Sequence, residues 1–249
     1  MRKLIPLLVS VLACSLVARP QSSQEAISMS NAIQEASRLT NPADAASYNR
    51  TGSFVSWHGG DKDSTRGSRL LFYNWPKGYV IGIYDTVLRD DRLFLNYDKI
   101  SHVLYFTVDG KTIIKVQTTQ ARELHFVDSG KQTVLVRIDG IDPKIFFERL
   151  SDSSGNYHYT LYREIKTQYR RANYETNGLT STGNNYDEYV DTYEYYIVMP
   201  GDRLYTHVRL KKKDIRQALG PKADAWLAVH SSDPINEAFL IGLVNQLNK

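Results

Sequence analysis

From Leu70 to Arg209 the chain alternates short runs of β-branched and aromatic residues with turn-forming residues, and this pattern limits it to a β-rich fold. The 17 tyrosines and 8 phenylalanines strengthen that preference, because aromatic side chains suit the pleated, half-buried surface of a sheet. Strands joined by tight turns pair with their neighbours, so we expect an antiparallel meander that forms a curved sheet, a sandwich or a partial barrel. The candidate strands are 70–74, 78–88, 92–97, 103–108, 111–116, 122–127, 132–138, 145–150, 157–171, 187–198 and 203–209.

The segments between these strands predict specific turns. Asp109–Gly110 suits a two-residue type I′ hairpin loop, and Asp128–Ser129–Gly130 suits a three-residue loop with glycine in the left-handed conformation. Asp90–Asp91 is expected to separate two further strands. The polar segment 177–185 follows the longest candidate strand, 157–171, and contains two glycines, so it predicts a mobile, projecting hairpin tip.

Helical signals dominate the last part of the chain. Residues 214–219 form a short helical segment ended by Gly220–Pro221, and Pro221 can open a second helix. Ser232–Asp233–Pro234 predicts the start of a third, with an N-cap followed by proline in the first turn. The third helix carries a broad apolar stripe that must cover a sheet face, made of Ile235, Phe239, Leu240, Leu243, Val244 and Leu247.

These elements predict the domain organisation. Residues 67–249 are expected to form a single β-rich domain, covered by C-terminal helices within 210–249, after a loosely ordered segment at 19–66. The formal charge of +4, from 31 Lys and Arg against 27 Asp and Glu, is too small for a nucleic-acid-binding protein. Beyond 1–18 no apolar run is long enough to span a membrane, so no membrane span is expected after that segment is removed.

Residues 1–18 have the features of a secretory signal peptide. Arg2 and Lys3 form a basic start, and an apolar stretch follows. Two modes of processing stay open. One is cleavage after Ala18, and the other is acylation of Cys14 within the lipobox-like sequence Val-Leu-Ala-Cys. Cys14 is the only cysteine, so no intramolecular disulfide can form, and the packing of the core must hold the fold.

No established catalytic pattern is present in the sequence. There is no nucleophile elbow and no phosphate-binding glycine loop, and no two histidines have the spacing of metal ligands on a helix. The sequence therefore predicts no catalytic residue, no cofactor and no metal site. Paired carboxylates could act on a sugar as acid and base, although such pairs more often form turns; they are Asp90 with Asp91, Asp139 with Asp142, and Asp187 with Glu188.

Two groups of residues are candidates for binding. The first is a set of tyrosines that could form an aromatic platform for a carbohydrate or a peptide, unless packing and cross-strand pairing account for them: Tyr186, Tyr189, Tyr193, Tyr195 and Tyr196. The second is a basic run that could touch an anionic surface, unless it only marks a solvated strand end: Lys211, Lys212 and Lys213.

The stretch Gly67–Tyr79, with its Gly-Ser start and Trp-x-x-Gly, is followed by Leu95–Asp98, a strand, an Asp-Gly turn and another strand. Together with a Lys-rich strand end that leads into helices and an Asn-containing tail at 243–248, it resembles uncharacterised exported proteins of Bacteroidota. The resemblance implies export and a β-rich fold, and it implies no activity, because that family has none assigned.

The sequence thus favours an exported, non-enzymatic binding or interaction module, periplasmic or extracellular, whose partner is an unknown envelope component or small ligand. Two alternatives stay open. One is an envelope hydrolase that acts on glycans. The other is a scaffold anchored to the outer membrane as a lipoprotein through Cys14.

The export interpretation makes the first testable prediction. Protein purified from its native host should begin after Ala18, or at an acylated Cys14, because signal peptidases remove such segments. Intact-mass measurement of the major species distinguishes the two forms. A major species that retains residues 1–18 would contradict both.

Overall fold

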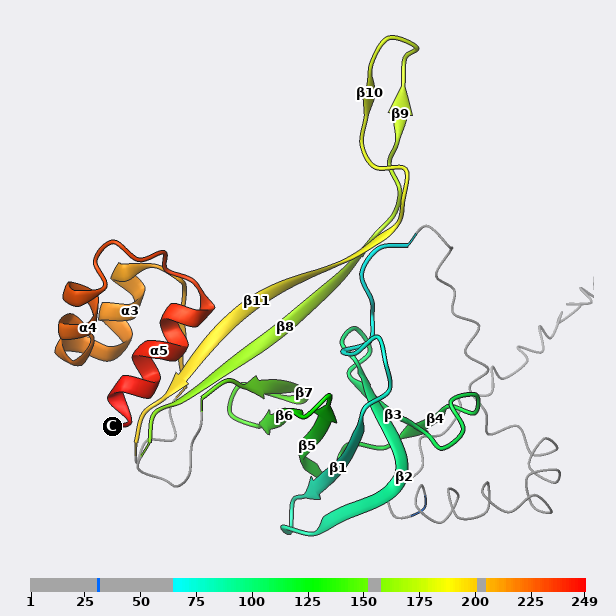
Figure 1. The fold of residues 1–249 in the computed structure, drawn as a ribbon, viewed down its shortest axis with the longest axis horizontal. Helices are drawn as coiled ribbons and strands as arrows, with labels where there is room; N and C mark the ends of the chain where they lie inside the picture. Colours follow the sequence, from blue (N-terminus) through cyan, green and yellow to red (C-terminus); the bar gives the residue numbers. More distant parts are fainter. Residues whose placement is uncertain (1–30, 32–64, 152–157, 201–204) are drawn as a thin grey trace, which may run out of the picture.

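The computed structural model describes residues 31, 65–151, 158–200 and 205–249 (Figure 1). Within them, one antiparallel open sheet of ten strands carries a small two-stranded hairpin and a set of C-terminal helices. The predicted mainly β fold with helices at the C-terminus is therefore confirmed. The predicted signal peptide with Cys14, and nearly all of the loosely ordered segment 19–66, lie outside the described residues.

The strands of the main sheet run in the order β12-β11-β8-β7-β6-β5-β1-β2-β3-β4. Consecutive strands are neighbours except at one place, where β5 returns beside β1 after β4 and interrupts the meander. Their bounds are β1 Lys77–Gly82, β2 Val87–Asp98, β3 Val103–Thr107, β4 Ile114–Val116, β5 Ala121–Asp128, β6 Lys131–Ile138, β7 Asp142–Arg149, β8 Thr160–Arg170, β11 Glu188–Val198 and β12 Tyr205–Val208.

The return of β5 forces the first half of the sheet to curl. In a flat sheet β4 and β5 would lie four strand spacings apart, about 19 Å. Only residues 117–120 join Val116 to Ala121, and five fully extended steps reach at most about 18 Å. Strands β1 to β6 therefore bend around one apolar face, which forms the first core. Its fully buried members are Leu93, Leu95, Leu104, Phe106, Leu124, Phe126 and Leu135.

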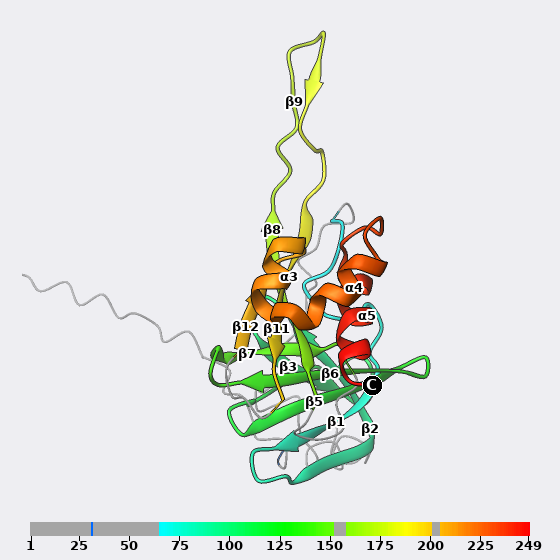
Figure 2. The same ribbon diagram turned by 90° about the vertical axis from the view of Figure 1, so that its left-hand side faces the viewer.

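The second half is a long ribbon of two strands. β8 and β11 pair without a break from Thr160 with Val198 to Arg170 with Glu188. β7 meets this ribbon at only two pairs, Glu148 with Arg163 and Arg149 with Tyr162. The ribbon therefore leaves the curled half, and its far end continues into the projecting hairpin of β9 (Glu175–Thr176) and β10 (Ser181–Thr182) (Figures 1 and 2).

The near end of the ribbon is covered by helices and forms a second core. The helices are α3 (Lys212–Leu219), the 3₁₀ turn η1 (Gly220–Ala223), α4 (Asp224–Val229) and α5 (Glu237–Leu247). The predicted stripe on the last helix is confirmed, because Phe239, Leu240, Leu243 and Val244 are buried and Ile235 and Leu247 are partly buried. They pack on Leu161, Tyr195 and Ile197 of the ribbon, on Tyr159 just before it, and on Val208 of β12.

Two strand predictions are wrong in the region before β3. Residues 70–74 form only a single bridge to β2, between Leu70 and Asp98. Beyond it, the side chain of Asn96 binds both the N–H and the carbonyl of Phe72, so the backbone pairing does not continue. The predicted strand 78–88 is two strands, joined by a turn over 83–86 in which Asp85 has a φ of 58°.

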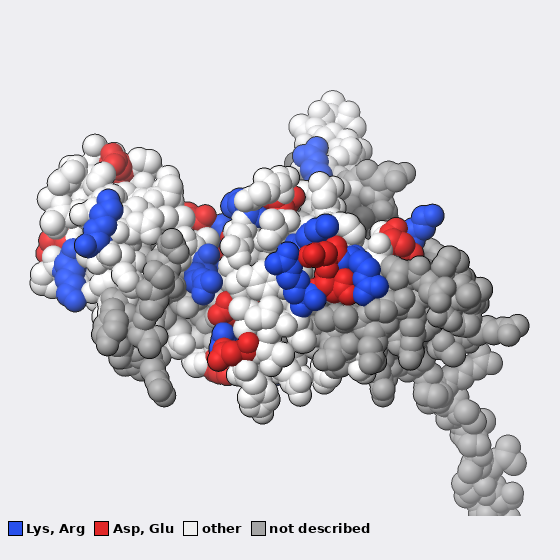
Figure 3. All heavy atoms as spheres, turned by 60° about the horizontal axis from the view of Figure 1, so that its bottom comes forward, with Lys and Arg blue, Asp and Glu red and all other residues white. Residues whose placement is uncertain are grey.

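Asp90–Asp91 lies inside β2, and no turn forms there. Both carboxylates are engaged by arginines of the same strand, Asp90 with Arg92 at 2.5 Å and Asp91 with Arg89 at 3.1 Å. This compensation lets two adjacent acids occupy an exposed stretch of strand. On the face shown in Figure 3, basic and acidic side chains likewise lie side by side.

Two hairpin loops differ from the predicted types. The loop after β5 has two residues, Ser129 and Gly130, both with positive φ, so it matches type I′ and not the predicted three-residue loop. Around Asp109–Gly110 only the glycine has positive φ. The Asp109 carboxylate instead accepts hydrogen bonds from the N–H groups of Lys111 and Thr112, which makes a longer loop.

The N-cap of the last helix also differs from the prediction. Asn236 is the N-cap of α5, and its side chain accepts a hydrogen bond from the N–H of Phe239 at 2.9 Å. The predicted Ser232–Asp233 lies before this cap, and its aspartate binds His230 at 2.7 Å.

Because α5 completes the second core, Phe239→Ala should destabilise the protein by about 2–5 kcal/mol. Val229→Ala is a matched control on the neighbouring helix, since Val229 is 79% exposed, and it should change stability by less than about 0.5 kcal/mol. Urea unfolding followed by circular dichroism measures both. Equal midpoints for the two variants would contradict the docking of α5.

Candidate interaction arm

The arm, defined here as residues 164–194, is the part of the β8–β11 ribbon that lies beyond the curled half, with its hairpin. β7 pairs with β8 only up to Arg163, and β12 pairs with β11 only from Tyr195 onward. Within the described residues, the sheet is therefore reduced to two strands along the arm. Arg66 adds a single bridge to it, by hydrogen bonds of 2.8 Å to Asp187 and Tyr189.

Residue alternation explains why a ribbon this long forms. On one face, charged side chains of the two strands pair across the ribbon, Lys166 with Glu194 at 2.9 Å and Arg170 with Glu188 at 3.8 Å. Opposite charges on directly neighbouring strands stabilise a two-stranded ribbon. The other face carries the residues that attach the arm to the rest of the molecule.

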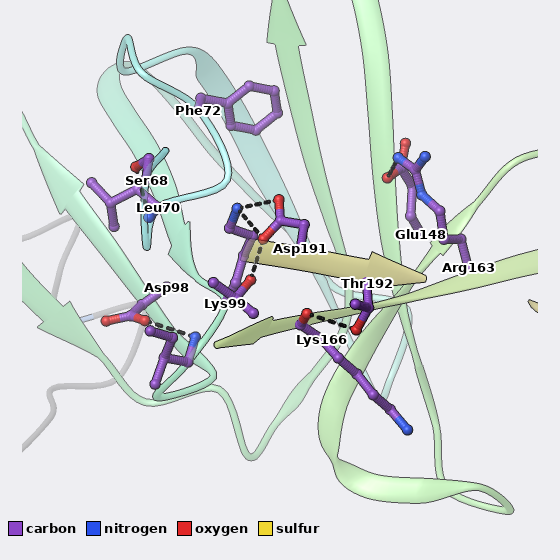
Figure 4. A network of polar contacts seen from close by, with 12 residues as sticks. Ser68, Leu70, Phe72, Asp98, Lys99, Glu148, Arg163, Lys166, Asp191 and Thr192 are labelled. Carbon is purple, nitrogen blue, oxygen red and sulfur yellow. Dashed lines mark hydrogen bonds and ion pairs between the residues drawn. The ribbon is translucent and has the colours of Figure 1, made fainter. Parts of the chain in front are cut away.

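The first attachment is a partly buried ion pair between Lys99 and Asp191 (Figure 4). The Lys99 ammonium group donates to both carboxylate oxygens, at 2.9 and 2.7 Å, and its side chain is only 7% exposed. Thr167 donates its hydroxyl to the same carboxylate at 2.6 Å. The turn after β2 is thereby bound to both strands of the arm.

The turn that carries Lys99 is itself fixed by Asp98. The fully buried Asp98 carboxylate accepts hydrogen bonds from the N–H groups of Ile100 and Ser101, at 2.9 and 3.0 Å, and from the Arg69 guanidinium. Burial alone would raise the pKa of Asp98, but these hydrogen bonds outweigh it and hold the pKa below its ordinary value. Asp98 therefore stays ionised and keeps the turn in one conformation.

The second attachment centres on Arg163, the last residue of β8 that pairs with β7. Its guanidinium contacts Glu148 of β7 at 2.5 Å and Glu237 of α5 at 2.7 Å (Figure 4 shows Glu148 and Arg163). Burial would lower the pKa of Arg163, but the two carboxylates outweigh it and raise the pKa. Tyr195 donates its hydroxyl to Glu237 at 3.0 Å, and burial followed by this carboxylate raises the pKa of Tyr195 to about 12.

The chemistry of this cluster is structural. Glu148 and Glu237 each accept a hydrogen bond from the guanidinium of Arg163. The predicted pairs are also engaged, because Asp139 binds Arg137 at 2.9 Å and Asp187 accepts hydrogen bonds from Tyr169 and Ala172. These contacts fix the carboxylates. The Arg163 contacts with Glu148 and Glu237 thereby position the base of the arm.

The hairpin at the end of the arm exposes its side chains. Asn177 shapes the tip by accepting hydrogen bonds from the N–H groups of Leu179 and Thr180 at 3.0 and 2.8 Å. Leu179 is 95% exposed, and Tyr174, which immediately precedes β9, is also exposed. Glu175 is the only charged residue in 172–185. The tip is thus a small surface with one charged residue, held away from the body.

The five predicted tyrosines do not share one surface. Tyr195 is buried in the second core, and Tyr196 points to the opposite face, where its hydroxyl donates to Glu164. Tyr186 lies under the Arg66 guanidinium, with 3.6 Å from the guanidinium carbon to the ring centre. Tyr189 packs on Tyr169, and Tyr193 is exposed beside Arg163; these two flank the Asp191 attachment.

The predicted basic run surrounds the start of α3. All three lysines are exposed, and Lys212 donates to the carbonyl of Ser231 at 2.6 Å. Contact of Lys211, Lys212 and Lys213 with an anionic surface stays a prediction.

His125 is a buried sheet residue, bound by Glu123 at 2.8 Å and Gln132 at 2.9 Å. Among the described residues, no group of three His, Cys, Asp or Glu could hold a metal ion.

Sequence reasoning missed the residues that attach the arm. The available signal was a charge on the inner face of a strand, since Arg163 and Asp191 interrupt a face of apolar and aromatic residues. A charge in such a place requires a partner. The partners Lys99 and Glu237 lie 92 and 74 residues away in the chain, and the sequence alone gives no means of selecting them.

Removal of the Arg163 guanidinium tests the second attachment. Arg163→Met should lower the free energy of unfolding by about 2–3 kcal/mol, because Glu148 and Glu237 are left together without a cation. Arg170→Met is the control in the same strand, since the Arg170 side chain is 55% exposed, and it should change stability by less than about 0.5 kcal/mol. Urea unfolding at neutral pH measures both, and a similar small loss in each would contradict the attachment.

No helix in the described part of the chain is long and apolar enough to cross a membrane. Comparisons with protein-family models, with curated proteins and with solved structures found no match to this chain. The resemblance to exported proteins of Bacteroidota therefore stays a prediction.

Proposed function

We propose that the protein is an exported, non-enzymatic interaction module that binds a partner protein through the tip of the arm. The observation that carries this proposal is an exposed hairpin with a single charged residue, on a ribbon that is fixed by partly buried ion pairs (Figures 1 and 2). Binding residues are commonly presented by loops on a rigid scaffold. The export part of the proposal rests on residues 1–18 alone.

The composition of the tip favours a protein as the partner. The cores of protein interfaces are depleted of charge and enriched in tyrosine. The tip matches this pattern, with one charge in 172–185 and with Tyr174 and Leu179 exposed. An anionic membrane surface would instead favour a cluster of lysine and arginine at the contact.

The attachment of the arm lowers the cost of binding. An arm that moved freely would lose conformational entropy when its partner ordered it. The Lys99–Asp191 and Arg163–Glu237 contacts already restrict the ribbon on one face, so less freedom is lost on association. The hydrolase alternative is less well supported, because Glu148 and Glu237 are both occupied by Arg163.

Site-specific crosslinking tests the proposal. A photo-reactive phenylalanine analogue placed at position 179 should give one dominant adduct with a partner protein in the native host, because Leu179 is the most exposed apolar residue of the tip. Tyr84 supplies the control, since it is 84% exposed in the turn between β1 and β2. The same analogue there should give no such adduct. The adducts are identified by mass spectrometry.

The double variant Tyr174→Ala and Leu179→Ala should abolish capture of the protein identified in that adduct while leaving the unfolding midpoint unchanged. Equal adducts from positions 179 and 84, or capture that survives the double variant, would overturn the proposal.

A further inference from the structure

A second candidate binding surface is the outer edge of β12, at the end of the ribbon opposite to the tip. β12 pairs with β11 on one side, and within the described residues no strand pairs with its other side. Alternate residues of such an edge direct their backbone N–H and carbonyl groups outward, where an added strand can bind them. Addition of a strand to a sheet edge is a common mode of peptide recognition.

An open groove follows this edge. It has a volume of about 290 Å³ and lies between Thr206, His207 and Arg209 on one side and α3 on the other. Successive residues of a strand point to opposite faces, so a hollow that touches both Thr206 and His207 must run along the edge of β12. Among the described residues, none from β11 lines it, which places it on the unpaired side. Figure 2 shows α3 above β12.

Both walls of the groove are fixed by the second core. Val208 of β12 is buried there, and so is Ala218, which lines the groove from α3. The connection between the two elements is tight, because the N–H of Lys211 binds the carbonyl of Arg209 at 2.7 Å. The groove is therefore formed before a ligand enters, which lowers the entropy that binding costs.

The charges of the groove favour an acidic ligand. Arg209 is exposed, and among the described residues its side chain has no ion-pair or hydrogen-bond partner. Lys211 and Lys213 are exposed in the same stretch and are likewise unpaired. Asp214 is the one acidic residue of the lining, and it forms no ion pair with Arg209. A carboxylate brought to this end of β12 would therefore meet three cations that have no anion of their own.

The wall formed by α3 has a different character. It presents Asp214 and Gln217 to the groove, beside the small Ala218. An acidic side chain that pointed at this wall would be repelled by Asp214, whereas a hydroxyl group could bind the amide of Gln217. Side chains of an extended peptide alternate between two faces. The groove thus suits a peptide in which acidic residues alternate with small polar ones.

We propose that the groove between β12 and α3 binds an extended acidic segment of another protein, which adds as a strand to the edge of β12. This gives the basic residues around the start of α3 a specific role. The site does not depend on the function proposed for the arm, because neither the tip nor the arm contributes to it.

A fluorescein-labelled hexapeptide of alternating threonine and glutamate tests the proposal with the full chain. Fluorescence anisotropy should show saturable binding with a dissociation constant below about 1 mM. The same peptide with lysine in place of glutamate should bind at least about tenfold more weakly, because Arg209 and the lysines would repel it.

Methylation of the peptide backbone tests the strand pairing. Two versions of the acidic peptide, methylated at the odd or at the even backbone nitrogens, should differ in affinity by at least about tenfold, because only alternate N–H groups face β12. Equal affinities of these two versions, equal binding of the acidic and basic peptides, or no saturable binding up to about 1 mM would each overturn the proposal.

Substitutions locate the site. Arg209→Glu should weaken binding of the acidic peptide at least about tenfold. Arg216→Glu is the matched control, since it makes the same charge change on α3 outside the groove, at a side chain that is 61% exposed, and it should weaken binding less than about threefold. Gln217→Trp should fill the groove and also weaken binding, which provides a second variant if Arg209→Glu does not fold.

The outcome that assigns these cations to a membrane is also defined. Sedimentation with phosphatidylglycerol vesicles measures that alternative. Binding to the vesicles without binding to the acidic peptide would overturn the proposal, and so would equal affinities of the Arg209→Glu and Arg216→Glu variants for the peptide.

Discussion

Strand pairing between the two halves of the sheet is limited to two residue pairs of β7 and β8, Glu148 with Arg163 and Arg149 with Tyr162. Arg163 reinforces this short pairing, because its guanidinium also binds Glu148 of β7 and Glu237 of α5. It thereby connects the curled half, the ribbon and the last helix. The chain has one cysteine and can form no intramolecular disulfide, so polar contacts and packing alone must hold the two apolar cores in their positions. The orientation of the arm follows from where this cluster fixes the ribbon.

Much of the architecture could be predicted from local sequence. The strand and helix types, the apolar stripe around Phe239 and the projecting hairpin follow from periodicity and turn residues, which act over a few positions. The errors occur where a distant or compensating side chain overrides the local signal. The side chain of Asn96 takes over the backbone groups of Phe72 and limits 70–74 to a single bridge, and arginines within β2 pair with Asp90 and Asp91.

The contacts that attach the arm could not be predicted. Each of them joins residues that are far apart in the chain, and the return of β5 beside β1 is equally non-local. Periodicity and turn residues predict each strand separately. The contacts between strands depend on the order in which the strands pair, which these signals do not determine.

The side chain of Asn248 has a consequence for how the molecule is made. It binds the N–H and the carbonyl of Tyr159 at 2.7 and 2.9 Å, in the manner of a neighbouring strand. The second core likewise needs residues up to Leu247, while β1 to β7 pair among themselves. The apolar side of the ribbon therefore acquires its cover only when the last residues of the chain dock, so the second core cannot close until every strand has been made.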